Sequence, residues 1–171
     1  MSLLRRNHEK PPVRRFQMKE KLISIGDDYW IEDDAGARAF KVDGKAARIR
    51  DSWVLEDGQG REVASIRERK LSVRDAIKIE TGGREYVVKK AIVGIRDRYV
   101  IETDGKNLKA HGNIVDHEYE IEQDGDKVAE VSKKWFRVRD TYGVEIAHEQ
   151  DDALLLAITV AVESLTEVLD R

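Results

Sequence analysis

The sequence predicts an all-β protein with one buried helix, in which about twelve antiparallel strands close into a barrel around a hydrophobic C-terminal helix. Three observations predict this fold. A motif recurs six times, a second series of turns lies between its copies, and the last segment is apolar on every face. Closing the sheet removes its edges, and the helix fills a lumen too wide for side chains alone.

The repeated motif is centred on an aspartate and recurs about every 22 residues. A β-branched residue stands two positions before the aspartate, an aliphatic residue four after it and a glutamate five after it, with one inserted residue in the fifth copy. Residues Val63–Asp75 also match Val128–Asp140 without a gap. The six central residues are Asp27, Asp51, Asp75, Asp97, Asp116 and Asp140.

Each copy predicts a hairpin and the strand that follows it. An aspartate holds a turn by accepting hydrogen bonds from nearby backbone N–H groups. We expect the apolar positions on either side of it to meet on one face across a short loop. Beyond the turn, apolar and polar residues alternate, which indicates a half-buried strand. The apolar pairs are Tyr29/Ile31, Trp53/Leu55, Ile77/Ile79, Tyr99/Ile101, Tyr119/Ile121 and Tyr142/Val144.

A second turn series lies between the aspartate copies. Asp-Gly and Gly-Gly pairs supply the positive φ that tight hairpins require. These turns lie at 33–36, 57–60, 81–83, 104–105 and 124–126. Two turns per repeat give two strands per repeat, so the Asp turns are expected at one end of the barrel and the Gly turns at the other.

The last segment predicts a helix over about 152–169. Asp151 and Asp152 provide an N-cap, and only Thr159 is polar between Ala153 and Val162. A helix that is apolar all round must be enclosed. A membrane span is the rival interpretation, but it needs roughly 20 largely apolar residues. This run is interrupted by Glu163, Ser164, Thr166 and Glu167.

Charge divides the chain into a basic arm and an acidic body. Residues 1–15 hold five basic residues against Glu9, a net charge of +4, so the other 156 residues carry −7 of the total −3. Residues 1–15 contain Pro11 and Pro12 and show no apolar periodicity. We therefore expect residues 1–15 to be a flexible arm and residues 16–171 to be the barrel domain. A solubilising tail is the ordinary interpretation; contact with a membrane or nucleic acid is the alternative.

Four groups of residues form a recognisable signature: Phe40–Lys45, Leu55–Asp57 with Gly60, Val131–Ile146, and Asp151 with Leu154, Leu156, Ala157 and Val160. In these residues the chain resembles the LURP-one-related family, a branch of the tubby C-terminal-like superfamily that includes the phospholipid scramblases. The resemblance covers about residues 17–169. It implies a twelve-stranded barrel around a hydrophobic C-terminal helix. Tubby domains bind phosphoinositide headgroups, and scramblases are lipid- and calcium-linked proteins with a terminal membrane segment, so the resemblance implies lipid binding.

The sequence offers little catalytic chemistry. It has no cysteine, and its seven serines stand in no nucleophile motif. His8, His111, His117 and His148 share no metal-ligand spacing, so we expect solvated histidines, no metal and no cofactor. No nucleotide-binding glycine pattern is present. We therefore expect a protein that is not an enzyme.

One set of residues suggests an anion site. Four arginines each precede a repeat aspartate, so they are expected at the same barrel end, where guanidinium groups could bind phosphate or carboxylate. Solvated turns are the alternative, because each arginine stands beside an acid. Two lysine pairs would widen the patch. The candidate residues are Arg50, Arg74, Arg96, Arg139, Lys89, Lys90, Lys133 and Lys134.

Together these features predict a non-catalytic binding or regulatory module for anionic phospholipid headgroups. The alternative is a protein–protein interaction or structural domain without a small ligand. We expect a cytoplasmic protein, peripheral to the membrane if it binds lipid, with no transmembrane span. Nucleic acid is not an expected partner, because the body is acidic and the pI is near 5.9.

Overall fold

The computed structural model describes residues 12–20, 28–43, 52–70, 75–91 and 98–169. This part of the chain forms twelve strands followed by one helix, α2. The elements are β1 (Val13–Lys19), β2 (Tyr29–Asp33), β3 (Arg38–Asp43), β4 (Ser52–Asp57), β5 (Glu62–Lys70), β6 (Asp75–Thr81), β7 (Arg84–Lys90), β8 (Arg98–Glu102), β9 (Leu108–Asn113), β10 (Glu118–Gln123), β11 (Asp126–Ser132), β12 (Thr141–Ala147) and α2 (Asp152–Leu169).

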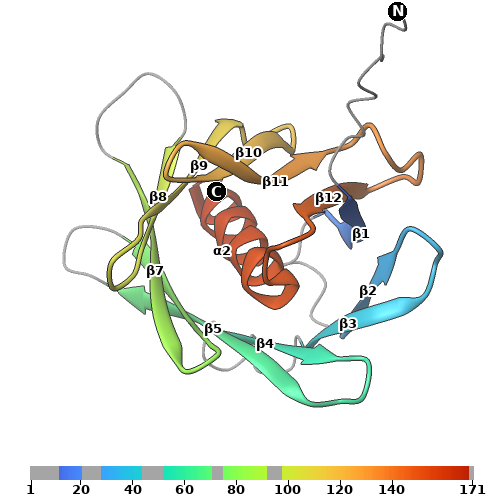
Figure 1. Cartoon of the computed structure of the whole chain (residues 1–171), viewed down its shortest axis with the longest axis horizontal. Helices are drawn as coiled ribbons and strands as arrows, with labels where there is room; N and C mark the ends of the chain where they lie inside the picture. The colour runs from blue at the N-terminus through green and yellow to red at the C-terminus, as the bar shows by residue number, and fades with distance from the viewer. Residues whose placement is uncertain (1–11, 21–27, 44–51, 71–74, 92–97, 170–171) are drawn as a thin grey trace, which may run out of the picture.

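The strands form a closed antiparallel barrel around α2, which confirms the predicted fold (Figure 1). Each strand pairs with its neighbours in sequence, and β1 closes the ring by pairing with β12 from Val13↔Ala147 to Lys19↔Thr141. The β1–β2 seam is much shorter, with only Phe16↔Asp33 and Gln17↔Glu32 in register. The ring is therefore complete, but its first two strands diverge.

The predicted alternation of apolar and polar residues is confirmed in every repeat. All twelve apolar positions that follow the repeat aspartates are buried, from Tyr29 and Ile31 in β2 to Tyr142 and Val144 in β12. Their side chains belong to one core cluster with Leu155, and with the apolar residues that follow it along α2. Each copy of the motif therefore contributes a strand that directs two apolar side chains toward the axial helix.

The Gly turns have the predicted positive φ. Gly82 and Gly83 form the two-residue turn between β6 and β7, with φ of 58° and 74°. In the turn after β4, the carboxylate of Asp57 accepts hydrogen bonds from the backbone N–H groups of Gln59 and Arg61, at 2.9 and 3.0 Å. Three hairpins also carry a register shift next to the repeat glutamate, as between Leu55 and Glu56.

We expect the carboxyl of Asp57 to titrate below its ordinary range. The backbone N–H of Arg61 lowers the pKa of Asp57 most, and the N–H of Gln59 lowers it further. The folded-state pKa is below the unfolded value of about 3.9, so this turn stabilises the fold above that pH. The contribution is lost as the pH falls through the folded value. An NMR titration of the Asp57 carboxyl carbon measures it, and a midpoint at or above that of the urea-unfolded chain would contradict the turn geometry.

The prediction of a short turn at each repeat aspartate is only partly correct. The fifth copy makes a four-residue turn over 114–117, in which Ile114 is fully buried as expected. In the sixth copy, β11 ends at Ser132 and β12 begins at Thr141, so Val138 lies in an eight-residue loop and is 57% exposed. The prediction that Val138 meets its counterpart on the inner face is wrong, because the strand has ended before this position.

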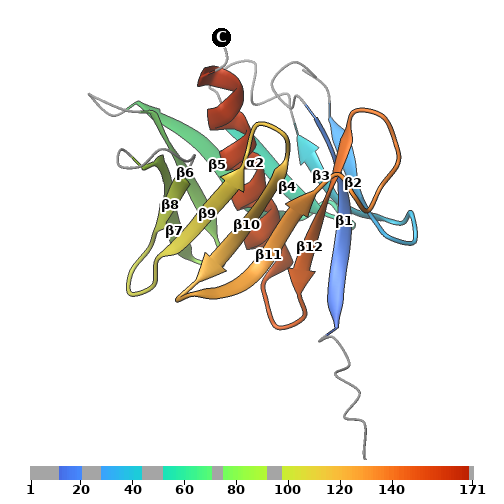
Figure 2. The same ribbon diagram turned by 90° about the horizontal axis from the view of Figure 1, so that it is seen from above.

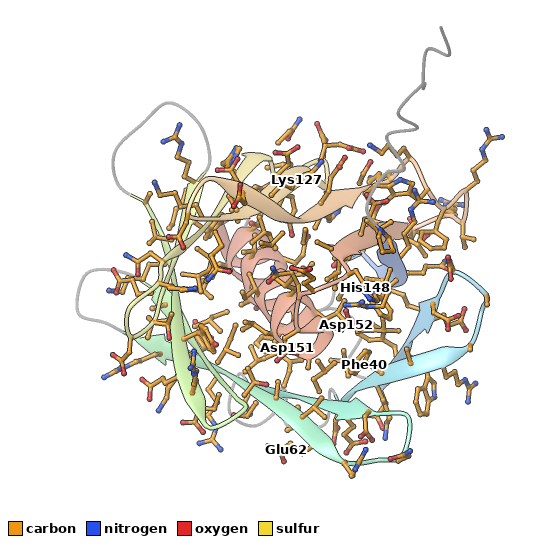
Figure 3. The ribbon with its side chains drawn as sticks, in the orientation of Figure 1. Phe40, Glu62, Lys127, His148, Asp151 and Asp152 are labelled. Carbon is orange, nitrogen blue, oxygen red and sulfur yellow. The ribbon has the colours of Figure 1, made fainter. Side chains whose placement is uncertain are left out.

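Helix α2 begins and ends where the sequence predicts, at Asp152 and Leu169. The carboxylate of Asp151 accepts a hydrogen bond from the N–H of Leu154 at 3.2 Å, which confirms it as the N-cap. Figure 3 shows Asp151, Asp152 and His148 grouped at the start of the helix. The helix then runs along the barrel to the opposite end (Figure 2).

The first strand begins at Val13, so the last three residues of the segment assigned to the arm form part of the barrel. Their side chains explain the difference. The guanidinium of Arg14 contacts the carboxylate of Asp152 at 2.8 Å, and Arg15 contacts Glu145 at 2.7 Å. Two of the basic residues counted in the arm therefore pair with acids of the barrel. Residues 1–11 lie outside the described part of the chain.

Candidate functional site

The ends of the odd-numbered strands and the starts of the even-numbered strands lie at one end of the barrel, which we name the Asp-turn end. The opposite end is the Gly-turn end. Two connections at the Asp-turn end fall within the described residues: the turn 114–117 and the loop 133–140. The last turns of α2 approach the same end. The predicted anion site is expected at this end.

Among the four predicted rim arginines, Arg139 is described, whereas Arg50, Arg74 and Arg96 lie outside the described residues. The side chain of Arg139 is 95% exposed, and its Nε lies 3.7 Å from a carboxylate oxygen of Asp140, which is also exposed. Ion pairs this exposed contribute little, so the guanidinium remains available to another anion. The rim as a set stays a prediction.

The predicted lysines lie at or near the Asp-turn end, but they have partners. Lys89, on β7, contacts Glu102 at 2.9 Å, and Lys90 also has an interaction partner. Just beyond β11, Lys133 contacts Glu20 and Lys134 contacts Glu130, both at 2.7 Å. The hydrogen bond from Lys133 to Glu20 raises the pKa of Lys133. These lysines belong to exposed ion-pair networks.

The loop 133–140 is fixed to the outside of the barrel by its aromatic residues. The facing residue of β12 is Gly143, where a Cβ would lie 2.8 Å from the Trp135 ring and 2.9 Å from the Phe136 ring. A glycine is therefore required for both rings to pack here. The cations of Arg15 and Lys134 lie 5.3 and 4.9 Å from the centre of the Trp135 ring.

With its aromatic residues held in this way, the loop exposes a short basic and apolar segment. Arg137, Val138 and Arg139 are all exposed. Over the eight residues of the loop, Lys133, Lys134, Arg137 and Arg139 stand against the single acid Asp140. Because both lysines are paired, the two arginines are the cations that this loop offers to an external anion.

A buried polar cluster lies behind this surface, at the end of the lumen. The side chain of Glu163, on α2, is only 4% exposed. One of its carboxylate oxygens accepts a hydrogen bond from the hydroxyl of Tyr119 at 2.9 Å, and the other lies 2.8 Å from Nδ1 of His117. The imidazole of His117 stacks on the Tyr142 ring at 4.6 Å. Burial raises the pKa of Tyr119 strongly, and the charge of Glu163 adds to this effect.

The buried cluster corrects the expectation of a solvated histidine at His117, whereas His8 lies outside the described residues. His117 is 13% exposed and lies against Glu163 of α2 and Tyr142 of β12. His111 and His148 are more accessible and contact Glu122 and Arg14, respectively. The sequence does show Glu163 at the end of the apolar run. It does not show that the turn carrying His117 lies beside it.

A cleft follows the short seam between β1 and β2. It has a volume of about 370 Å³ and lies where these strands diverge, beside the loop 133–140. Its lining mixes apolar and charged side chains, including Met18, Trp30, Glu32, Val138 and Arg139. This mixed lining suits a ligand that carries both apolar and polar groups.

The sequence of almost the whole barrel matches one family model. A model described as LURP-one-related covers residues 14–163. The chain belongs to the LURP-one-related family. The matched region begins within β1 and ends at Glu163 in α2, so it includes every strand and most of the axial helix.

A solved structure shares the LURP-one-related fold described above. The X-ray structure of an Arabidopsis thaliana protein superposes with a TM-score of 0.66 and 19% sequence identity, covering 94% of this chain and 93% of that chain. At this identity the likeness supports the fold alone. No curated protein matches the chain significantly in sequence.

The described part of this LURP-one-related protein contains no helix that is long and apolar enough to cross a membrane. Its helix is instead enclosed by strands, and Leu156, Ile158 and Val160 have no exposed surface. This agrees with the expectation of a core helix.

Proposed function

We propose that the protein is a non-catalytic binding module whose Asp-turn end docks on anionic phospholipid headgroups. The observation that carries this proposal is the loop 133–140, in which Arg137 and Arg139 flank the exposed apolar side chain of Val138. In this arrangement the guanidinium groups contact phosphates while the valine enters the region just below them. The protein would then be cytoplasmic and peripheral to the membrane.

The construction of the loop supports a surface contact rather than a deep pocket. Trp135 is held against the barrel by Gly143, Arg15 and Lys134, so it stiffens the loop rather than forming its tip. A fixed loop loses little conformational entropy when it docks. The acids near the loop neutralise the two lysines and limit the attraction, so we expect weak binding that falls as salt concentration rises.

The proposal predicts binding to anionic liposomes that depends on these two arginines. A basic residue near an anionic membrane contributes about 1 kcal/mol. We therefore expect the double variant Arg137→Ala/Arg139→Ala to bind roughly 30-fold more weakly than the original chain. Sedimentation with liposomes of neutral lipid alone, and with added anionic lipid, at low and near-physiological salt, measures the effect.

Two controls distinguish binding at this site from nonspecific attraction of other basic residues to anionic lipid. Arg84 is an exposed arginine in the Gly-turn end of the barrel, so Arg84→Ala should bind as the original chain does. Removing residues 1–11 leaves β1 intact and should also preserve binding, because β1 begins at the Gly-turn end. No binding, equal binding by the double variant, or binding that disappears with residues 1–11 would overturn the proposal.

The cleft between β1 and β2 favours a second candidate, a protein-interaction domain without a small ligand. Beyond Gln17↔Glu32 the described parts of β1 and β2 no longer pair with each other. Met18 and Lys19 of β1 and Trp30 of β2 therefore lie on facing strand edges that are not paired with one another. An extended peptide can add to such edges through its backbone. A stable complex with a protein partner, without any response to lipid, would favour this candidate over headgroup binding.

A further inference from the structure

We infer that the outer face of β9 and β10 carries a binding site for a divalent transition-metal ion such as Zn²⁺, formed by His111, Glu120 and Glu122. Each side chain offers one ligand atom, and these atoms all lie within 4.8 Å of one another. Nε2 of His111 and a carboxylate oxygen of Glu122 are already 2.8 Å apart. None of the three ligands belongs to the loop 133–140, and the inference does not rest on the proposed lipid docking.

The strand register explains why the three side chains converge. His111 on β9 stands directly opposite Glu120 on β10, and Glu122 follows two residues later on the same face. Side chains two apart on one strand, together with the opposite residue of its neighbour, form a triangle of adjacent groups. The pairing of β9 with β10 is continuous through all three positions, so the two strands hold the triangle in place, although the β10–β11 register shifts between Ile121 and Glu122.

The ligand types favour a transition metal over Ca²⁺ or Mg²⁺. One imidazole nitrogen and two carboxylate oxygens are typical ligands of Zn²⁺, with water completing a tetrahedron. Bonds of about 2.1 Å place tetrahedral ligand atoms roughly 3.4 Å apart, which small side-chain rotations from the present positions achieve. Calcium takes six to eight oxygen ligands, which these three side chains do not supply.

Nearby cations set the expected strength of the site. Nζ of Lys127, on β11, lies 3.6 Å from Glu120, but it is closer to Glu130 at 3.0 Å. Glu130 can therefore retain this lysine when an ion binds Glu120. Arg98 stands opposite His111 on β8, and Lys109 stands opposite Glu122. Three neighbouring cations weaken the attraction for a divalent ion, so we expect micromolar rather than nanomolar affinity.

Isothermal titration of the full chain with Zn²⁺, after removal of any purification tag, tests the site. We expect one equivalent to bind, and His111→Ala or Glu122→Gln to weaken binding by about tenfold or more, since loss of even an outer-shell partner has an effect of this size. Lys127→Ala should instead strengthen binding, because it removes a competitor for Glu120. Ca²⁺ at the same concentrations should not bind.

The matched control is His148→Ala, which removes an exposed histidine in the turn before α2. Adventitious binding to surface histidines would weaken in this variant as much as in His111→Ala. That result, unchanged binding in His111→Ala, or no heat of binding up to millimolar Zn²⁺ would overturn the inference. Thermal melting without metal confirms that each variant is folded.

Discussion

Leu156→Asp is expected to abolish folding. Leu156 lies in the second turn of the axial helix and has no exposed surface. An unpaired carboxylate at this position costs several kcal/mol or more to bury, against a total stability on the order of 10 kcal/mol. Circular dichroism should show loss of the cooperative thermal transition, and gel filtration should show an expanded or aggregated chain.

The matched control is Val115→Asp, which places the same carboxylate in the turn 114–117. Val115 is 52% exposed, so its replacement should leave the melting temperature almost unchanged. If Leu156→Asp melted like the original protein, the helix could not be the core of the barrel.

Glu163→Leu should produce the second large effect. The substitution leaves the Tyr119 hydroxyl without its acceptor and Nδ1 of His117 without the neighbouring carboxylate, at the end of the lumen. Removing one partner of a buried polar pair typically costs about 3 kcal/mol. For a chain of this size we expect the melting temperature to fall by about 6 to 12 °C.

A double-mutant cycle separates this interaction from simple packing. Tyr119→Phe removes only the hydroxyl, so Glu163→Leu combined with Tyr119→Phe should cost less than the sum of the two single changes. Glu149→Leu, in the exposed turn before α2, provides the control and should have little effect. Strictly additive losses would mean that the buried contact does not stabilise the fold.

The barrel and its helix could be predicted because local patterns determine them. Each repeat aspartate is followed by two apolar residues at strand spacing, and pairs such as Tyr99 and Ile101 need only alternate to become buried. The limits of α2 follow from Asp151 and from the apolar run after it. The sixth Asp turn could not be predicted, because Trp135 and Phe136 pack on Gly143, a contact within the loop and the start of β12 that the alternation of apolar and polar residues does not show.

The candidate site was less predictable for the same reason. The sequence identifies Arg139 as a turn residue, and its exposure agrees with that prediction. It does not reveal that Glu20 and Glu130 neutralise Lys133 and Lys134, since those acids are brought close only by the barrel register and the loop path. The contact between His117 and Glu163 likewise requires knowing which turn meets the end of the helix.

The measurement that tests the central functional claim most directly is site-specific fluorescence at both ends of the barrel. The chain has no cysteine, so Val138→Cys and Gln59→Cys can each carry a single environment-sensitive dye. Both positions are exposed, one in the Asp-turn end and one in the Gly-turn end. Each labelled protein is titrated with neutral liposomes and with liposomes that contain anionic phospholipid.

The dye at position 138 should brighten and shift to the blue with anionic liposomes alone, because it enters a less polar environment there. The dye at position 59 should not respond. A response at position 59 with none at position 138, or no response from either dye, would contradict docking through the Asp-turn end.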